Sequence, residues 1–167
     1  LAITVLVVGA VVSVVLMAPA PATAGGAEQI RGTAIDGSGD CNPVEDGVPV
    51  PLPIFPLYFP DEEGGMHGCL YTYPTSFQET PGGTIRERGH EIFVSHDDHT
   101  SRFETTYQYT AKFDKDGNQM YGRCQHPITE GTGIDDFEDV TGRFDIKDNI
   151  VNGVAVDFAY KGHLRFP

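Results

Sequence analysis

The feature of this chain that most constrains its fold is a two-residue alternation of apolar and polar side chains. In Arg102–Asp114 one face is mainly aromatic and the other is polar or charged, and Val154–Phe166 repeats the pattern. Successive side chains of a β-strand point to opposite faces of the sheet, so this alternation is typical of strands. No segment after residue 24 carries the i, i+3, i+4, i+7 apolar spacing of an amphipathic helix. The chain is therefore predicted to be all-β.

Turn signals such as Pro81-Gly82-Gly83 and Asp116-Gly117 separate the candidate strands. Eight are predicted: Gln29–Ile35, Cys69–Glu79, Thr84–Ser95, Arg102–Asp114, Met120–Thr129, Ile134–Val140, Thr141–Ile150 and Val154–Phe166. Consecutive strands linked mostly by hairpins close most simply into an up-and-down antiparallel barrel, because closure removes exposed edges. A two-sheet sandwich is the alternative. An eight-stranded barrel either fills itself with side chains or holds one small ligand.

Residues 36–68 have a different character from the rest of the chain. They contain six prolines, and proline removes backbone donors, so neither a central strand nor a helix is expected there. Residues 50–59 are nevertheless too apolar for a solvated linker. We expect a loop packed over one end of the domain; the alternative is a lid or a partner-docking surface at 48–60.

The N-terminal segment is interpreted as a targeting signal. Leu1–Ala18 is an apolar run, and Ala22 and Ala24 fit the A-x-A pattern that signal peptidase cleaves. We predict a signal peptide over 1–24, a barrel domain over 25–167 and a secreted product. An uncleaved membrane anchor is the alternative, because 18 apolar residues are at the lower limit for a span.

The charge balance restricts the partners. Eleven Lys and Arg against 24 Asp and Glu give a formal net charge of −13. Nucleic acids and anionic membranes attract basic surfaces, so neither is expected to bind the mature protein. We expect no cofactor, a small apolar molecule as the partner, and leave oligomerisation open.

Three cysteines in an exported chain leave one without an intrachain partner. We favour a Cys41–Cys69 disulfide, since these residues bracket the loop that needs tethering; Cys69–Cys124 is the alternative. No pair has zinc-finger spacing. The His96-Asp97-Asp98-His99 sequence could hold a metal only if the turn curls, and a solvated acidic turn is the simpler interpretation. No metal is predicted.

Two glutamates are the candidate catalytic groups. Glu87 and Glu91 share a strand face with Ile85, Gly89 and Phe93. If that face lines the barrel, desolvation favours catalytic use of the two carboxyl groups. They lie about 13 Å apart along one strand, too far for a glycosidase pair. The alternative is that a neighbouring arginine neutralises each one, or that both face solvent.

A second set of residues is predicted to contact a ligand. His126 follows Cys124 by two residues, so the two side chains point to the same side of one strand. With Tyr107 and Tyr109 they form a candidate polar floor for an interior cavity. Phe103 and Tyr160 complete the predicted ligand-binding residues. The alternative for His126 is a buried side chain with a purely structural hydrogen bond.

Several spaced blocks in residues 69–166 resemble a known barrel family. They are Gly83–Ser95, Gly122–Ile128, Gly131-Thr132-Gly133, Phe137, Val140–Arg143, Asp145–Asp148 and Tyr160–Leu164. They resemble the allene oxide cyclase-like barrel group, especially its secreted bacterial members, and the glycine-rich element also resembles dirigent proteins. The resemblance implies an eight-stranded barrel with a hydrophobic cavity that positions an unsaturated lipid epoxide or a radical pair. The plant enzymes' catalytic residues have no matching motif here.

The sequence therefore supports two functional hypotheses. The first is a secreted barrel that binds a small hydrophobic ligand, with cyclase, isomerase or dirigent-like activity as its catalytic form. The second is a non-catalytic extracellular protein with a filled barrel and a partner-docking proline-rich loop. An interior cavity distinguishes them.

Overall fold

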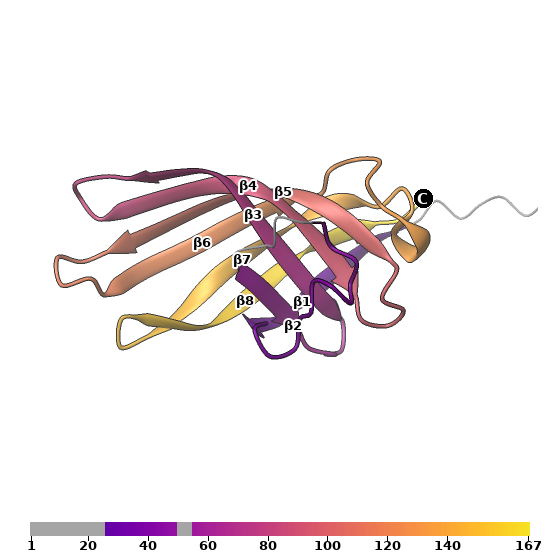
Figure 1. Ribbon diagram of the computed structural model, residues 1–167, viewed down its shortest axis with the longest axis horizontal. Helices are drawn as coiled ribbons and strands as arrows, with labels where there is room; N and C mark the ends of the chain where they lie inside the picture. Colours follow the sequence, from indigo (N-terminus) through magenta and orange to yellow (C-terminus); the bar gives the residue numbers. More distant parts are fainter. Residues whose placement is uncertain (1–25, 50–54) are drawn as a thin grey trace, which may run out of the picture.

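The computed structural model describes residues 26–49 and 55–167, and the predicted signal peptide lies outside them. Eight antiparallel strands form a closed barrel, in which each strand pairs with its sequence neighbours and β1 pairs with β8 (Figure 1). The strands are β1 (Ala27–Asp36), β2 (Phe55–Phe59), β3 (Gly68–Glu79), β4 (Thr84–Ser95), β5 (Arg102–Phe113), β6 (Gln119–Pro127), β7 (Thr141–Val151) and β8 (Val154–Arg165). The predicted all-β, eight-stranded barrel is confirmed. Within the described residues, no helix is long and apolar enough to cross a membrane.

The expectation that 36–68 contains no central strand is wrong at Phe55–Phe59, which forms β2 between β1 and β3. Pro56 is tolerated in this strand because of where its backbone nitrogen lies. The carbonyl of Pro56 accepts the N–H of Gly37 at 3.0 Å, so the polar edge of Pro56 faces β1. The β1–β2 pairing ends one residue away, at Asp36↔Leu57. The missing N–H of Pro56 therefore falls where no ladder bond is required.

The predicted strand Ile134–Val140 is also wrong. The segment is a loop that contains a short 3₁₀ helix, Asp135–Phe137. Ile134, Phe137 and Val140 recur every three residues, which matches the three residues per turn of a 3₁₀ helix better than the period of a strand. Val140 is buried and Phe137 packs against the core, so the loop closes one end of the barrel.

That end of the barrel is filled by aromatic side chains. Phe59, Phe93, Phe103 and Phe144 are fully buried, with ring centroids 5.7 Å apart for Phe59–Phe93 and 5.0 Å for Phe93–Phe103. The ring of Phe137 lies 5.0 Å from that of Phe103 and covers the group. We call this half of the barrel, next to the 134–140 loop, the packed half.

We call the other half the cavity half. It ends in the β3–β4, β5–β6 and β7–β8 hairpins (Figure 1). The short β2 pairs with β3 only as far as Phe55↔Thr72, and β6 pairs with β7 only as far as Arg123↔Lys147. Beyond these points, among the described residues, β3 has no ladder pair on its β2 side and β6 has none with β7.

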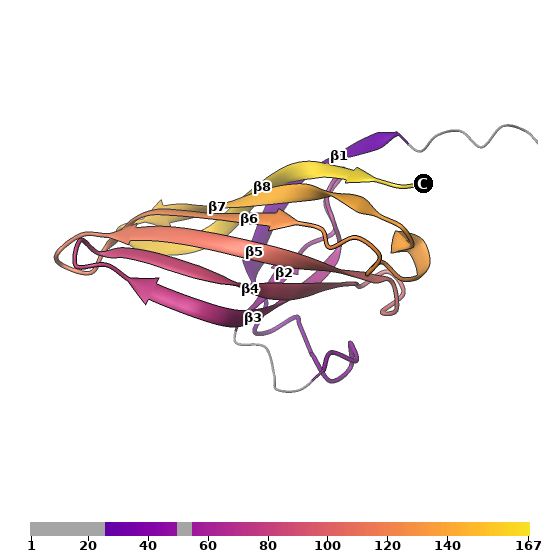
Figure 2. The same cartoon turned by 90° about the horizontal axis from the view of Figure 1, so that it is seen from above.

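Residues 37–49 lie outside the barrel wall, next to β3 (Figure 2). The Cys41–Cys69 disulfide, with Cα atoms 5.8 Å apart, attaches this segment to β3, as the sequence predicted. Val48 packs on outward-facing side chains of β3 and β4 in a second hydrophobic cluster, with Cys69, Tyr71, Ile92 and Val94. Cys124 is the free cysteine, and it is buried.

Candidate functional site

An interior cavity of about 440 Å³ occupies the cavity half of the barrel. Every strand except β1 contributes to its wall. The apolar part of the wall consists of Phe55, Leu57, Pro74, Ile146, Ala155 and Phe158. Small-molecule sites occupy about 300–1,000 Å³ and combine such walls with a few polar groups. Here the polar groups are arranged around three carboxylates.

The first carboxylate, Glu91, is buried at 2% exposure and has three donors. Its Cα pairs directly with Thr72 on β3 and Thr105 on β5, so both hydroxyls lie beside it. Thr105 donates to Oε2 at 2.8 Å and Thr72 to Oε1 at 3.2 Å. Nδ1 of His126 lies 2.6 Å from Oε2. Glu91 therefore fixes the orientation of the imidazole, a role that carboxylates often have beside histidines.

His126 stacks on Phe144, with ring centroids 4.6 Å apart and nearly parallel planes, and it lines the cavity. Its other nitrogen, Nε2, is buried without a hydrogen-bond partner among the described residues. In the neutral imidazole, a hydrogen bond from Nδ1–H to Glu91 leaves Nε2 as a lone-pair acceptor. Buried polar atoms are nearly always paired, so Nε2 of His126 is an unsatisfied position in the wall of the cavity.

The second carboxylate, Glu87, accepts the Tyr107 hydroxyl at 2.6 Å. Gly89 makes this contact possible, because a Cβ at that position would lie 2.6 Å from Cε1 of Tyr107. The tyrosine ring can thus cross the strand between the two glutamates. Burial, followed by the hydrogen bond and charge of Glu87, raises the pKa of Tyr107, so its hydroxyl remains a donor at neutral pH.

The third carboxylate, Asp148 on β7, was not among the sequence candidates. Its Oδ2 accepts the Tyr109 hydroxyl at 2.8 Å and Nε2 of Gln119 at 2.5 Å. The Gln119 contact crosses the region where β6 and β7 separate. The alternation Phe144, Ile146, Asp148 would have placed Asp148 on the interior face by the same period-two argument that was applied to the glutamates.

The structure brings five of the seven ligand-binding and catalytic candidates to the cavity wall: Glu87, Glu91, Tyr107, Tyr109 and His126. Phe103 and Tyr160 are instead in the packed core, where the Tyr160 hydroxyl accepts the Met66 N–H at 2.8 Å. Neither glutamate has an arginine partner among the described residues, and Glu91 is buried, whereas Glu87 is half-buried. The donors to both glutamates are hydroxyl groups and an imidazole.

The His96–His99 turn does curl, and it packs on the outer loop. Nε2 of His96 lies 3.8 Å and Nδ1 of His99 lies 3.3 Å from the buried carboxylate of Asp46, which also accepts the Tyr71 hydroxyl. Two imidazoles and a carboxylate are donor types that zinc or copper accepts. The nearby sulfur of Cys69 is in the disulfide and offers no thiolate. The expected absence of a metal stays a prediction.

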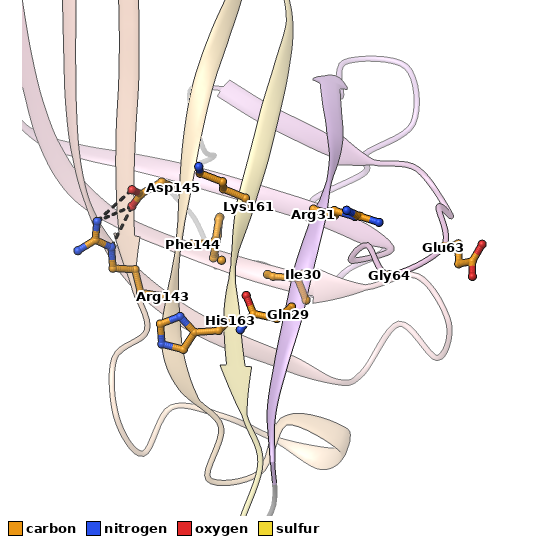
Figure 3. Close-up of a pocket in the computed structure, with 11 residues that line it drawn as sticks. Gln29, Ile30, Arg31, Glu63, Gly64, Arg143, Phe144, Asp145, Lys161 and His163 are labelled. Carbon is orange, nitrogen blue, oxygen red and sulfur yellow. Dashed lines mark hydrogen bonds and ion pairs between the residues drawn. The ribbon is translucent and has the colours of Figure 1, made fainter.

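A larger groove of about 890 Å³ lies on the outer surface of β1, β7 and β8 (Figure 3). Arg31, Lys161 and Arg143 extend along it, and Arg143 is paired with Asp145 at 2.9 Å (Figure 3). These side chains are exposed, and the groove is open to solvent rather than enclosed by the fold. The interior cavity, by contrast, has buried polar groups that hydrogen bonds hold in position.

Comparison with known protein families, with functionally characterised proteins and with solved structures finds no match to this chain.

Proposed function

We propose that this protein is an exported barrel that binds a small, largely apolar molecule in its interior cavity. The observation that carries the proposal is the cavity of about 440 Å³, which has apolar walls and polar groups fixed in position by hydrogen bonds. The Cys41–Cys69 disulfide supports export, since disulfides persist in oxidising compartments. The resemblance to the allene oxide cyclase-like and dirigent barrels agrees with the same function.

A cyclase-, isomerase- or dirigent-like reaction is the catalytic form of this proposal. Glu91 and His126 are the groups suited to proton transfer, because a carboxylate that orients one ring nitrogen leaves the other to act as base. Tyr107 and Tyr109 lie in the same wall and orient the ligand.

The competing function, a filled barrel with a docking loop at 48–60, has less support. Leu57 and Phe59 supply part of the apolar character of that loop, and both are buried inside the barrel wall. They are therefore not available to an external partner.

A cavity-filling substitution tests the proposal. Ala155 lines the cavity, whereas Val151 is 53% exposed and does not. We expect the wild-type protein to bind the neutral probe 1-naphthalenemethanol with one-site saturation, and Ala155→Phe to weaken binding at least tenfold. Val151→Phe, the matched control, should stay within twofold of the wild type. If no apolar probe shows saturable binding to the wild-type protein, the non-catalytic structural alternative is favoured.

A further inference from the structure

The charges that line the cavity all have one sign, apart from one imidazole. Glu87, Glu91 and Asp148 contribute carboxyl groups, and His126 is the one basic residue in the wall. No lysine or arginine is among the described residues that line it. Charged groups are costly to bury without a compensating partner. The interior therefore presents an excess of carboxylate to whatever occupies it.

The three carboxylates differ in how many hydrogen-bond donors the protein supplies to each. Glu91 has three donors. Glu87 has one donor, which reaches Oε1, and both donors to Asp148 reach Oδ2. Oε2 of Glu87 and Oδ1 of Asp148 consequently have no hydrogen-bond partner among the described residues. An ionised carboxylate can accept about four hydrogen bonds, so both groups retain acceptor capacity.

Two donors reach the same oxygen of Asp148. The side-chain nitrogen of Gln119 can only donate, so Oδ2 must accept, and Oδ2 also accepts the hydroxyl of Tyr109. Burial, and then the charge of Glu91 with further contributions from Asp148 and Glu87, raises the pKa of the neighbouring Cys124 thiol. The carboxyl groups of the cavity wall therefore disfavour the binding of a further anion.

The remaining surfaces of the site also suit a cation. The aromatic residues Phe55, Tyr107, Tyr109 and Phe158 line the cavity, and aromatic faces attract ammonium groups by cation–π interaction. The hydroxyls of Tyr107 and Tyr109 are committed as donors to carboxylates, and Nε2 of His126 is without a partner. The site therefore offers hydrogen-bond acceptors to a ligand that brings donors.

We propose that the ligand of this cavity is a small apolar amine, bound as its ammonium form with Glu87 and Asp148 as the acceptors. This inference rests on the proposed function, since it names the class of molecule that the same cavity selects. An ammonium group supplies three donors and a positive charge, whereas an anionic lipid would place a further negative charge beside three carboxylates. The strongly acidic protein as a whole adds an attractive field for a cation.

A matched ligand series tests the sign of the charge. 1-Naphthylmethylamine, 1-naphthalenemethanol and 1-naphthoate have the same apolar body with a cationic, neutral or anionic substituent. In isothermal titrations at pH 7 we expect the amine to bind at least tenfold more tightly than the alcohol, and the carboxylate not to bind at millimolar concentration. Equal or tighter binding of the alcohol or the carboxylate would overturn the amine proposal while leaving the ligand-binding barrel intact. If none of the three binds, the ligand-binding function itself is wrong and this inference fails with it.

Charge-neutral substitutions locate the acceptors. We expect Glu87→Gln and Asp148→Asn each to reduce amine affinity about tenfold and to leave 1-naphthalenemethanol within twofold. Glu104→Gln removes one charge from an exposed position on β5, so it should leave both affinities unchanged. If Asp148→Asn does not fold, Glu87→Gln decides, because Glu87 is only half-buried. Amine binding that survives in Ala155→Phe, or that Glu104→Gln weakens as much as Glu87→Gln does, would assign it to the acidic outer surface and overturn the proposal.

Discussion

At the scale of single residues, the interior carboxylates depend on glycines as much as on hydrogen-bond donors. A Cβ at Gly122 would lie 1.8 Å from Oδ2 of Asp148, and a Cβ at Gly89 would overlap the ring of Tyr107. Alternation placed Glu87 and Glu91 on one strand face and left open whether that face lines the barrel. The partners of these two residues come from neighbouring strands, and that register is not visible in a single sequence. This is why the sequence suggested arginines where the structure has threonines and tyrosine.

Substitution of Gly122 tests this dependence. Gly122→Ala should displace Asp148 from Tyr109 and Gln119, since the new Cβ would occupy the position of its carboxylate. We expect a loss of about 2–4 kcal/mol in unfolding free energy, measured by urea denaturation, from overpacking plus disrupted buried hydrogen bonds. Gly82→Ala is the matched control, because the nearest atom to its Cβ is 4.0 Å away, and it should change stability by less than about 0.5 kcal/mol.

A double-mutant cycle then identifies the cause. If the clash with Asp148 is responsible, Gly122→Ala should cost less when Asp148 is already alanine than when it is aspartate. Equal costs in both backgrounds would show that Gly122 acts through the backbone alone.

At the scale of whole elements, the sequence predicted the number of strands correctly but through two errors that cancel. It missed β2, because prolines argue against a central strand unless the absent N–H happens to face an unpaired edge, as it does at Pro56. It placed a strand at Ile134–Val140, where three apolar residues spaced by three indicate a 3₁₀ turn. The long hairpin strands, with their unambiguous alternation and Asp-Gly turn, needed no tertiary information.

The Cys41–Cys69 disulfide holds the outer loop and β2 in place. Cys41 and Cys69 are 28 residues apart, and β2 lies between them. Closing a loop of this length should stabilise the fold by about 3–4 kcal/mol in the chain-entropy model. We therefore expect the double variant Cys41→Ser, Cys69→Ser to lose about that much unfolding free energy in urea.

Reductant provides the control for the disulfide. Dithiothreitol should lower the stability of the wild-type protein toward that of the double variant and leave the double variant unchanged. Equal stability of oxidised wild type and double variant would show that the packing of Val48 and Asp46 holds the outer loop without the covalent link.

At the scale of the whole molecule, the barrel has one half that is filled by aromatic side chains and one that contains the cavity. The packed half contains the stacked phenylalanines, whereas the ladder between β6 and β7 ends at Arg123↔Lys147 in the cavity half. Period-two patterning indicates which residues face inward, but not how far their side chains fill the interior. The sequence could therefore predict a closed barrel and five residues of the cavity wall, but not that Phe103 and Tyr160 pack the other half.

This division predicts uneven local stability. Amides of the packed half, such as those of Phe93 and Phe103, should open only with global unfolding, because they are enclosed by fully buried rings. Amides of Met120–Gly122 and Val154–Asp157 should exchange through local opening, since each segment lacks a strand pair on one side among the described residues. Native-state hydrogen exchange in increasing urea measures both free energies.

Phe93→Ala should cost about 3–5 kcal/mol, and Phe158→Ala, whose ring already borders a void, should cost less. Uniform protection, or equal costs for the two substitutions, would show that the cavity closes in solution and that the barrel behaves as a single packed unit.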